Sequence, residues 1–174
     1  MRTDVEQLIA HFGMTPLPSE GTLFASTYRS TEELPDGGPV GTAMIGMYCD
    51  EPVSQSRFHR LPVDEVWHFY AGDPLRLLLL CPDGTTRDVV LGPNPLAGHQ
   101  VQFVVPAGVW QAGHMVAGGR YALFGCTMAP GFTGRMYEGA VRNDLLARYP
   151  GRADDIARFA GEAADARMPD GFAR

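Results

Sequence analysis

The chain has 174 residues, 45% of them hydrophobic, and a formal net charge of −6. This length is typical of one domain that can bury a real core, and the acidic balance argues against nucleic acid or an anionic membrane as a partner. All 14 basic residues are arginine, which excludes Schiff-base chemistry by a lysine.

We expect a cytoplasmic protein with free thiols. The N-terminus shows no basic region followed by an apolar run, and the apolar stretch 75–81 is far too short to cross a bilayer. Cys49, Cys81 and Cys126 are odd in number and lie far apart in the sequence, which argues against a disulfide framework or a zinc site. We therefore predict three buried thiols.

A short helix is predicted at the start of the chain, over residues 3–12. Its apolar side chains share one face, Thr3 and Glu6 form a capping box, and Gly13 ends the helix. We expect this helix to cover one end or edge of the structure that follows.

Many short strand-like runs come next, separated by turns. Residues 32–40 contain two prolines and two glycines and are predicted to form a loop, which is a candidate lid over a ligand. Regular spacing of short strands is typical of a sandwich, barrel or jelly roll. The predicted strands are 22–28, 42–48, 57–61, 65–71, 76–81, 86–91, 101–105, 110–116 and 121–128.

The pattern changes after Pro130, where two helical runs replace the strands. Residues 143–149 and 152–160 read as helices split by a Pro-Gly pair. We expect residues 1–174 to form a single domain with a barrel over about 20–130 and a helical extension outside it over about 138–161. The polar, Ala- and Gly-rich tail, 162–174, is a candidate for disorder.

Two segments carry the candidate chemistry, and the first is 58–72. It contains His59, Glu65 and Gly72 at the spacing of the first cupin motif, in which His-x-His is followed by Glu and then by Gly. Leu61 stands where the second histidine of that motif would be. The segment therefore keeps one histidine and the glutamate of the usual metal ligands.

The second segment, 105–111, resembles the second cupin motif, Pro-x-Gly-x-x-His-x-x-x-Asn. Pro106 and Gly108 match it, but Gln111 takes the place of the histidine and Met115 that of the asparagine. Strings such as FHRL, DEVWHFYAG, PLRLLLL, VVPAGVWQAG and GCTMAPGF resemble cupin family five, a family without an agreed reaction, over about residues 4–150.

The resemblance implies an all-β fold, the double-stranded β-helix (jelly-roll) barrel of cupins, with a short N-terminal helix and C-terminal helices. It also implies a homodimer. Because side chains alternate along a strand, Trp67 and Phe69 should point into the barrel with Glu65, and His68 should point outward.

His59 and Glu65 allow two chemical interpretations. In one they are general acid and base in a metal-free site, because a carboxylate tunes a neighbouring imidazole. This outline is similar to that of the sugar-nucleotide epimerases among cupins and favours an isomerase- or epimerase-like enzyme that needs no cofactor. In the other, His59, Glu65 and Gln111 hold a divalent metal such as Fe, Mn, Ni or Zn.

The metal-dependent alternative would be a dioxygenase, lyase or cyclase. His99 and His114 are candidate supplementary ligands, although strand parity directs His114 away from Gln111. A non-catalytic module that binds a small molecule and a buried structural His59–Glu65 pair are further alternatives.

Six residues are candidates for contact with a small-molecule ligand. Arg57 shares parity with His59 and could anchor a carboxylate or phosphate, and Tyr48 could supply a phenol acid, with surface charge and core as the plainer alternatives. Aromatic side chains and an amide are common in ligand pockets. The candidates are Tyr48, Arg57, Trp67, Phe69, Trp110 and Gln111.

Overall fold

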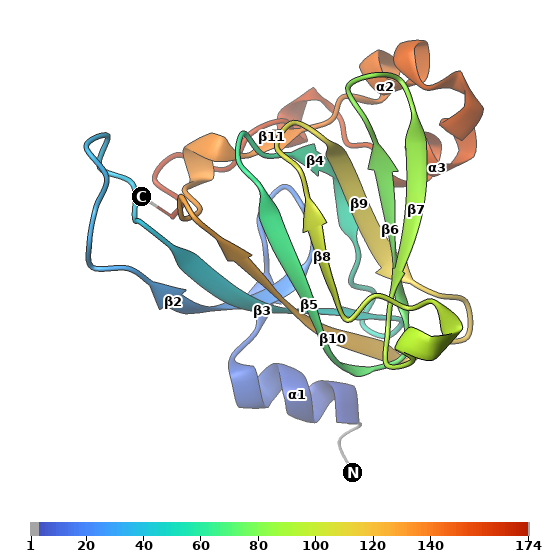
Figure 1. The fold of residues 1–174 in the computed structure, drawn as a ribbon, viewed down its shortest axis with the longest axis horizontal. Coiled ribbons are helices and arrows are strands. Elements are labelled where there is room, and N and C mark those ends of the chain that lie inside the picture. Colours follow the sequence, from blue (N-terminus) through green and yellow to red (C-terminus); the bar gives the residue numbers. More distant parts are fainter. Residues whose placement is uncertain (1–3, 174) are drawn as a thin grey trace.

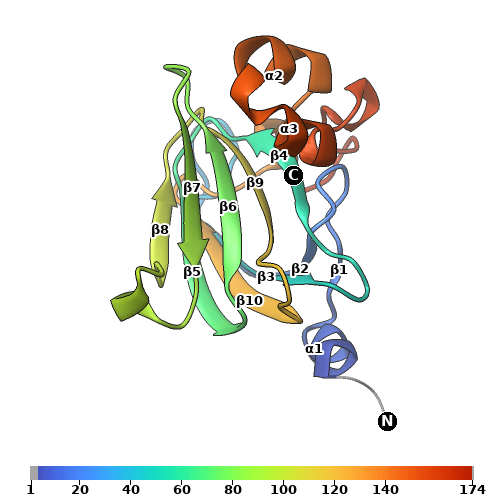
Figure 2. The same cartoon turned by 90° about the vertical axis from the view of Figure 1, so that its right-hand side faces the viewer.

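In the computed structural model, which describes residues 4–173, two antiparallel β-sheets face each other as a jelly roll (Figure 1, Figure 2). The six-stranded sheet has the order β1-β2-β3-β10-β5-β8, and the five-stranded sheet has the order β11-β4-β9-β6-β7. The strands are β1 Thr15–Pro16, β2 Leu23–Arg29, β3 Thr42–Cys49, β4 Ser56–Arg60, β5 Glu65–Gly72, β6 Leu75–Leu80, β7 Thr86–Leu91, β8 Gln102–Val105, β9 Trp110–Met115, β10 Tyr121–Met128 and β11 Glu138–Gly139.

All nine predicted strands are present, and the structure adds two that the sequence did not indicate. These are β1 and β11, which are only 2 residues long each and carry no alternating pattern. The helices are α1 Asp4–Phe12, α2 Arg142–Arg148 and α3 Ala153–Phe159, and the 3₁₀ turns are η1 Pro95–Ala97, η2 Gly134–Met136, η3 Pro150–Arg152 and η4 Ala163–Asp165.

Strand β6 shows why one run of leucines can serve two cores. Leu77 and Leu79 point between the sheets, whereas Leu78 and Leu80 pack on the outside under the C-terminal helices. A strand that is covered on both faces is apolar throughout rather than alternating. The five-stranded sheet is therefore buried on both sides where α2 and α3 cover it (Figure 2).

The C-terminal helices pack outside the sheets, as expected. Ile156 and Phe159 of α3 are 0% and 1% exposed and contact Phe58 and Trp110 from β4 and β9. The hydroxyl of Tyr149 donates to the carbonyl of Cys81 at 2.7 Å, which ties the end of α2 to the loop after β6.

Helix α1 covers part of the outer face of the six-stranded sheet (Figure 1). Val5 is 4% exposed and packs with Met47 and Leu123. The helix confirms the prediction, while Thr3 of the predicted capping box lies outside the described residues.

The tail, a candidate for disorder in the sequence, is placed against the sheets. Met168 is 7% exposed and packs with Leu17 and Tyr137, and the ring of Phe172 lies edge-on to Phe24 at 6.2 Å. The prediction of disorder rested on the average composition of the tail, whereas two individual apolar side chains, Met168 and Phe172, anchor it.

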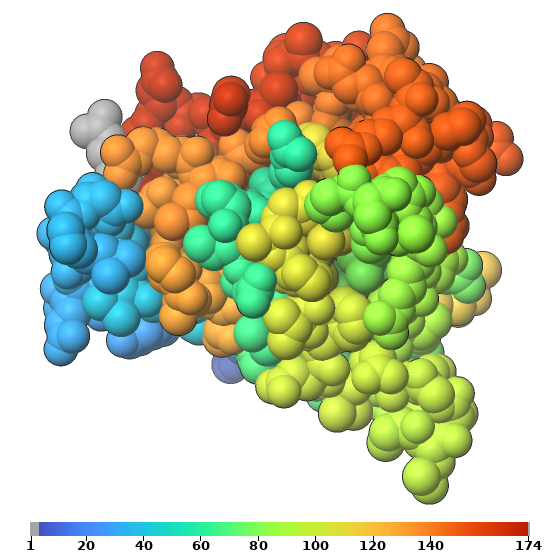
Figure 3. Space-filling model, turned by 45° about the horizontal axis from the view of Figure 1, so that its top comes forward, coloured from blue at the N-terminus to red at the C-terminus, as the bar shows by residue number. Residues whose placement is uncertain are grey.

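The remaining loops agree with the sequence. Residues 32–40 form the predicted loop between β2 and β3, and their closure over a ligand stays a prediction. The segment around η1 projects from the surface, with Leu96 99% exposed (Figure 3). The three cysteines are free; Cys49 and Cys126 are buried as predicted, whereas Cys81 is only partly buried. No helix within residues 4–173 is long and apolar enough to span a bilayer.

Candidate functional site

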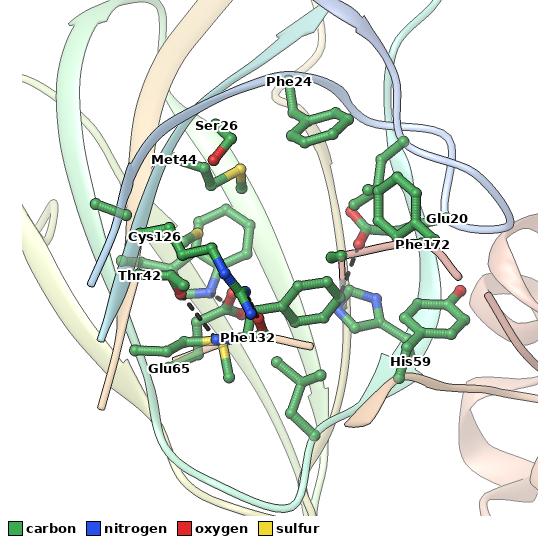
Figure 4. Close-up of a pocket in the computed structure, with 18 residues that line it drawn as sticks. Glu20, Phe24, Ser26, Thr42, Met44, His59, Glu65, Cys126, Phe132 and Phe172 are labelled. Carbon is green, nitrogen blue, oxygen red and sulfur yellow. Dashed lines mark hydrogen bonds and ion pairs between the residues drawn. The ribbon is translucent and has the colours of Figure 1, made fainter. Parts of the chain in front are cut away.

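A cavity of about 320 Å³ lies between the sheets (Figure 4). Strands β2, β3, β5 and β10 of the six-stranded sheet supply most of its wall, and β4 of the other sheet supplies His59. Most lining side chains are apolar. The ionisable side chains on its wall are Glu20, Arg29, His59, Glu65, Cys126 and Tyr137.

His59 is held in one orientation on this wall. It is 3% exposed, and its Nδ1 lies 2.8 Å from the carbonyl oxygen of Arg57, which can only accept. A proton is therefore assigned to Nδ1, so that in the neutral imidazole Nε2 carries the lone pair. Nε2 lies 3.8 Å from Oε2 of Glu20, and the ring of Tyr137 stacks on the imidazole at 5.4 Å.

Glu20 is a buried carboxylate that precedes β2. It is 7% exposed, and the hydroxyl of Thr22 donates to its Oε1 in a short hydrogen bond. Its main-chain carbonyl accepts from the amide of Arg57 at 3.0 Å, which joins this loop to β4. The two bonds leave Oε2 directed at His59.

Glu65 belongs to a separate polar cluster beside His59. Its Oε2 accepts from Nε1 of Trp67 at 3.1 Å and from Nε2 of Gln111 at 2.7 Å. Burial raises the pKa of the Glu65 carboxyl, and the Glu20 carboxylate raises it further, while His59 and the two hydrogen bonds oppose them. The carboxyl therefore keeps its proton to a higher pH than an exposed glutamate.

Residues 6–140 match the family described as Cupin superfamily (DUF985). The chain belongs to this cupin family. The resemblance predicted from the sequence is thereby confirmed, together with the jelly-roll fold of cupins. No curated protein matches the chain.

Solved structures of two proteins are similar over nearly the whole cupin chain. A hypothetical protein from Leishmania major is 27% identical with a TM-score of 0.82, over 92% of this chain and 100% of that one. A protein from Shewanella oneidensis is 28% identical with a TM-score of 0.82, over 93% and 99%. Oxalate decarboxylase from Bacillus subtilis is 12% identical with a TM-score of 0.53, over 92% of this chain and 42% of that one, which shows the fold alone.

Three of the predicted site residues line the cavity of this cupin: His59, Glu65 and Trp67. Gln111 is 1% exposed and lies behind them, bonded through its amide to Glu65 and Trp67. Trp110 was expected in the pocket and is not there. It is next to Gln111 on the same strand, so it points to the opposite face, where it packs under α3. There the guanidinium carbon of Arg60 lies over its ring, 4.5 Å from the ring centroid.

Phe69, Tyr48 and Arg57 also lie outside the cavity wall. Phe69 and Tyr48 pack in the core between the sheets, and the Tyr48 hydroxyl is 2.7 Å from that of Ser56. The prediction for Arg57 assumed regular alternation, but the pairing of β4 with β9 shifts between Ser56 and His59. Arg57 thus lies at the surface, paired with Asp165 at 2.7 Å.

The other histidines lie away from the site, and His68, His99 and His114 are half-buried. His68 points outward as expected and contacts Thr127 at 2.9 Å. His114 stacks on Phe159 at 4.9 Å, and burial there lowers its pKa. His99 lies just after η1 and is half-buried. None of the three supplements the cavity.

The donor set does not fit a tightly bound divalent metal. The Gln111 amide is engaged with Trp67 and Glu65, and the second histidine of the cupin motif is replaced by Leu61, which lines the cavity. Within residues 4–173 no group of three or more His, Cys, Asp or Glu side chains is arranged to hold a metal ion. We therefore derive no chemical step through a metal.

Four residues of the site carry no signal in the sequence: Glu20, Arg29, Tyr137 and Phe172. Glu20 lies in a turn, and Tyr137 and Phe172 lie beyond the cupin motifs. Tyr137 reaches His59 because β11 pairs with β4, a two-residue contact between segments far apart in the chain. Its buried hydroxyl has no hydrogen-bond partner among residues 4–173.

Replacing Glu65 by glutamine should change the pH dependence of stability. The pKa of Glu65 is higher in the folded protein than in the unfolded chain. Its protonated carboxyl therefore contributes stability that is complete below the unfolded-state pKa and is lost as pH rises through the folded-state pKa. The variant keeps acceptors for Trp67 and Gln111 but cannot ionise. Urea unfolding should therefore show it gaining stability relative to wild type as pH rises from about 4 to about 8.

The matched control for this comparison is Glu32→Gln, which removes a carboxylate from the exposed loop. Its stability difference from wild type should stay nearly constant across the same pH range. A difference for Glu65→Gln that is equally constant would show that Glu65 ionises in the folded protein as it does in the unfolded chain.

Proposed function

We propose that this cupin is an isomerase- or epimerase-like enzyme that moves a proton of a small organic molecule held in the cavity. The observation that carries the proposal is the orientation of His59. The hydrogen bond of Nδ1 to the Arg57 carbonyl leaves Nε2 as a base on the cavity wall, beside the Glu20 carboxylate.

The proposed reaction needs no co-reactant. Nε2 of His59 removes a proton from a carbon next to a carbonyl, and the Glu20 carboxylate stabilises the resulting imidazolium. The protonated Glu65 carboxyl donates a hydrogen bond to the carbonyl oxygen as negative charge develops there. The imidazolium proton exchanges with solvent, and Nε2 then returns a proton either to a neighbouring carbon or, after the intermediate has turned in the cavity, to the other face of the original carbon.

In this assignment, the carboxylate partner of His59 differs from the one that the sequence suggested. Glu20, rather than Glu65, is the carboxylate within ion-pair distance of His59. Glu65 is instead bonded to Trp67 and Gln111, and burial raises the pKa of its carboxyl, which favours the protonated form. Two carboxyl groups in different surroundings can thus take different roles, as catalytic acid–base pairs commonly do.

A screen for hydrogen–deuterium exchange tests the proposal even while the substrate is unidentified. Pools of small carbonyl compounds, sugars among them, are incubated in deuterium oxide with the protein and followed by mass spectrometry. We expect incorporation of one deuterium into at least one compound. Compounds that bind but do not exchange would instead favour the non-catalytic binding module.

Metal analysis tests the donor-set argument separately. Untagged protein purified without chelator should contain far less than one transition metal per chain, and added Fe, Mn, Ni or Zn should not raise the melting temperature. Near-stoichiometric metal would contradict the metal-free proposal and favour a dioxygenase, lyase or cyclase with His59 and Glu65 as ligands.

A homodimer and a cytoplasmic location are also proposed. The outer face of the six-stranded sheet near β8 exposes Tyr70, Val101 and Val104, which are 52%, 51% and 45% accessible. Exposed apolar side chains that gather on one sheet face suit contact with a second copy.

A further inference from the structure

Arg29, at the end of β2, is a cation on the cavity wall without a carboxylate partner among residues 4–173. Its Nη1 donates to the carbonyl of Phe132 at 3.4 Å, which directs the guanidinium without neutralising it. Among the described residues, six other arginines form ion pairs, and those that form none, such as Arg87, do not line this cavity; the six are Arg57, Arg60, Arg76, Arg120, Arg142 and Arg152.

An irregularity in β2 places Arg29 on the cavity wall, where its side chain stays exposed to solvent. The pairing of β2 with β3 matches Phe24 with Gly46 and Ser26 with Met44, then shifts, so that Arg29 rather than Tyr28 lies opposite Thr42. Phe24, Ser26, Met44 and Thr42 line the cavity, and so does Arg29. Tyr28 and Arg29 are both exposed, and of the two only Arg29 lines the cavity. Bulges near sites commonly re-aim a side chain in this way.

Arg29 and His59 lie toward opposite ends of the cavity. Glu20, the partner of His59, comes just before β2, whereas Arg29 ends that strand. At about 3.3 Å per residue, the backbone positions of Leu23 and Arg29 are separated by roughly 20 Å. Figure 4 accordingly shows Thr42, the register partner of Arg29, on the opposite side from Glu20 and His59.

We propose that Arg29 binds a carboxylate or phosphate of the ligand, so that the substrate class is small organic anions. Guanidinium groups bind these oxyanions through paired hydrogen bonds. The anion lies at Arg29, the apolar body passes Phe24 and Met44, and the reacting carbon lies at His59. An anion at the other end would meet the Glu20 carboxylate. The inference extends the proposed function by naming its substrate class.

Matched pairs of acid and amide test the inference by binding alone. Phenylacetate and phenylacetamide, and 4-phenylbutyrate and its amide, are titrated by ligand-observed NMR, with phenyl phosphate as a second oxyanion. We expect wild type to bind at least one acid about tenfold more tightly than its amide. The phosphate arm shows which of the two oxyanions Arg29 prefers.

Three variants connect the preference to Arg29. Arg29→Gln should remove it, and Arg29→Lys should keep part of it, because lysine retains the charge without the planar fork. Arg87→Gln makes the same change of net charge on β7, where Arg87 lies over Phe103, and should keep the full preference. Equal affinity of every acid and its amide for wild type, including no binding by either, would overturn the inference.

The outcome is distinguishable from failure of the proposed function. An Arg29-dependent preference for acids without any deuterium exchange would leave the anion site standing and remove the enzymatic proposal. Deuterium exchange confined to neutral compounds and unaffected by Arg29→Gln would support the enzymatic proposal and remove the anion site.

Discussion

Replacing His59 by glutamine should lower the rate of deuterium exchange by about 10²- to 10⁴-fold, the usual contribution of a general base. Glutamine approximates the size of the imidazole but cannot take up a proton. The cavity should still bind its ligand, because its walls are mostly supplied by other strands. The exchange rate and the ligand-induced rise in melting temperature are measured on the same preparation.

The matched control is His68→Gln, which changes a histidine on the outer face of the sheet. It should exchange at the wild-type rate. Glu20→Gln should be slower than wild type but faster than His59→Gln, because the base remains while its carboxylate partner is lost. Full exchange activity in His59→Gln would remove His59 from the mechanism.

Replacing Phe159 by alanine should destabilise the fold by about 3–5 kcal/mol, the usual cost of emptying a buried aromatic site. Phe159 is 1% exposed and lies in the cluster formed by Phe58, Trp110 and Ile156. Its removal leaves a void between α3 and the five-stranded sheet. Denaturant unfolding at neutral pH gives the free energy of unfolding for both proteins.

Leu96→Ala is the control for that loss, since Leu96 is also apolar but 99% exposed. It should change stability by less than about 0.5 kcal/mol. A comparably small effect of Phe159→Ala would mean that the C-terminal helices contribute little to the fold. It would also mean that the packing of α3 on Phe58 does little to hold β4, the strand that carries His59.

Strand parity explains most of what the sequence predicted correctly. Alternation along 65–71 placed Glu65 and Trp67 inside and His68 outside, and all three positions agree with the structure. The same rule would have directed Trp110 outward, because Trp110 is next to Gln111 on one strand and Gln111 points inward. The aromatic character of Trp110 and its place in the motif suggested ligand contact instead.

The sequence could not reveal the two features that complete the site. Irregular pairing turns Arg57 away from the cavity and places Arg29 on its wall, and a shift of one residue leaves no mark in composition or spacing. Glu20 and Tyr137 reach His59 through contacts between distant segments. Such contacts depend on the folded arrangement of the sheets and not on any local pattern.

In the proposed mechanism, His59 acts as a base on a molecule held in this cavity. The most direct test of this role is deuterium exchange by wild type and His59→Gln, measured side by side on the same pools of carbonyl compounds. We expect incorporation by wild type at a carbon next to the carbonyl, and a loss of about 10²-fold or more in the variant. No incorporation by wild type into any compound that binds, or equal incorporation by both proteins, would contradict this role.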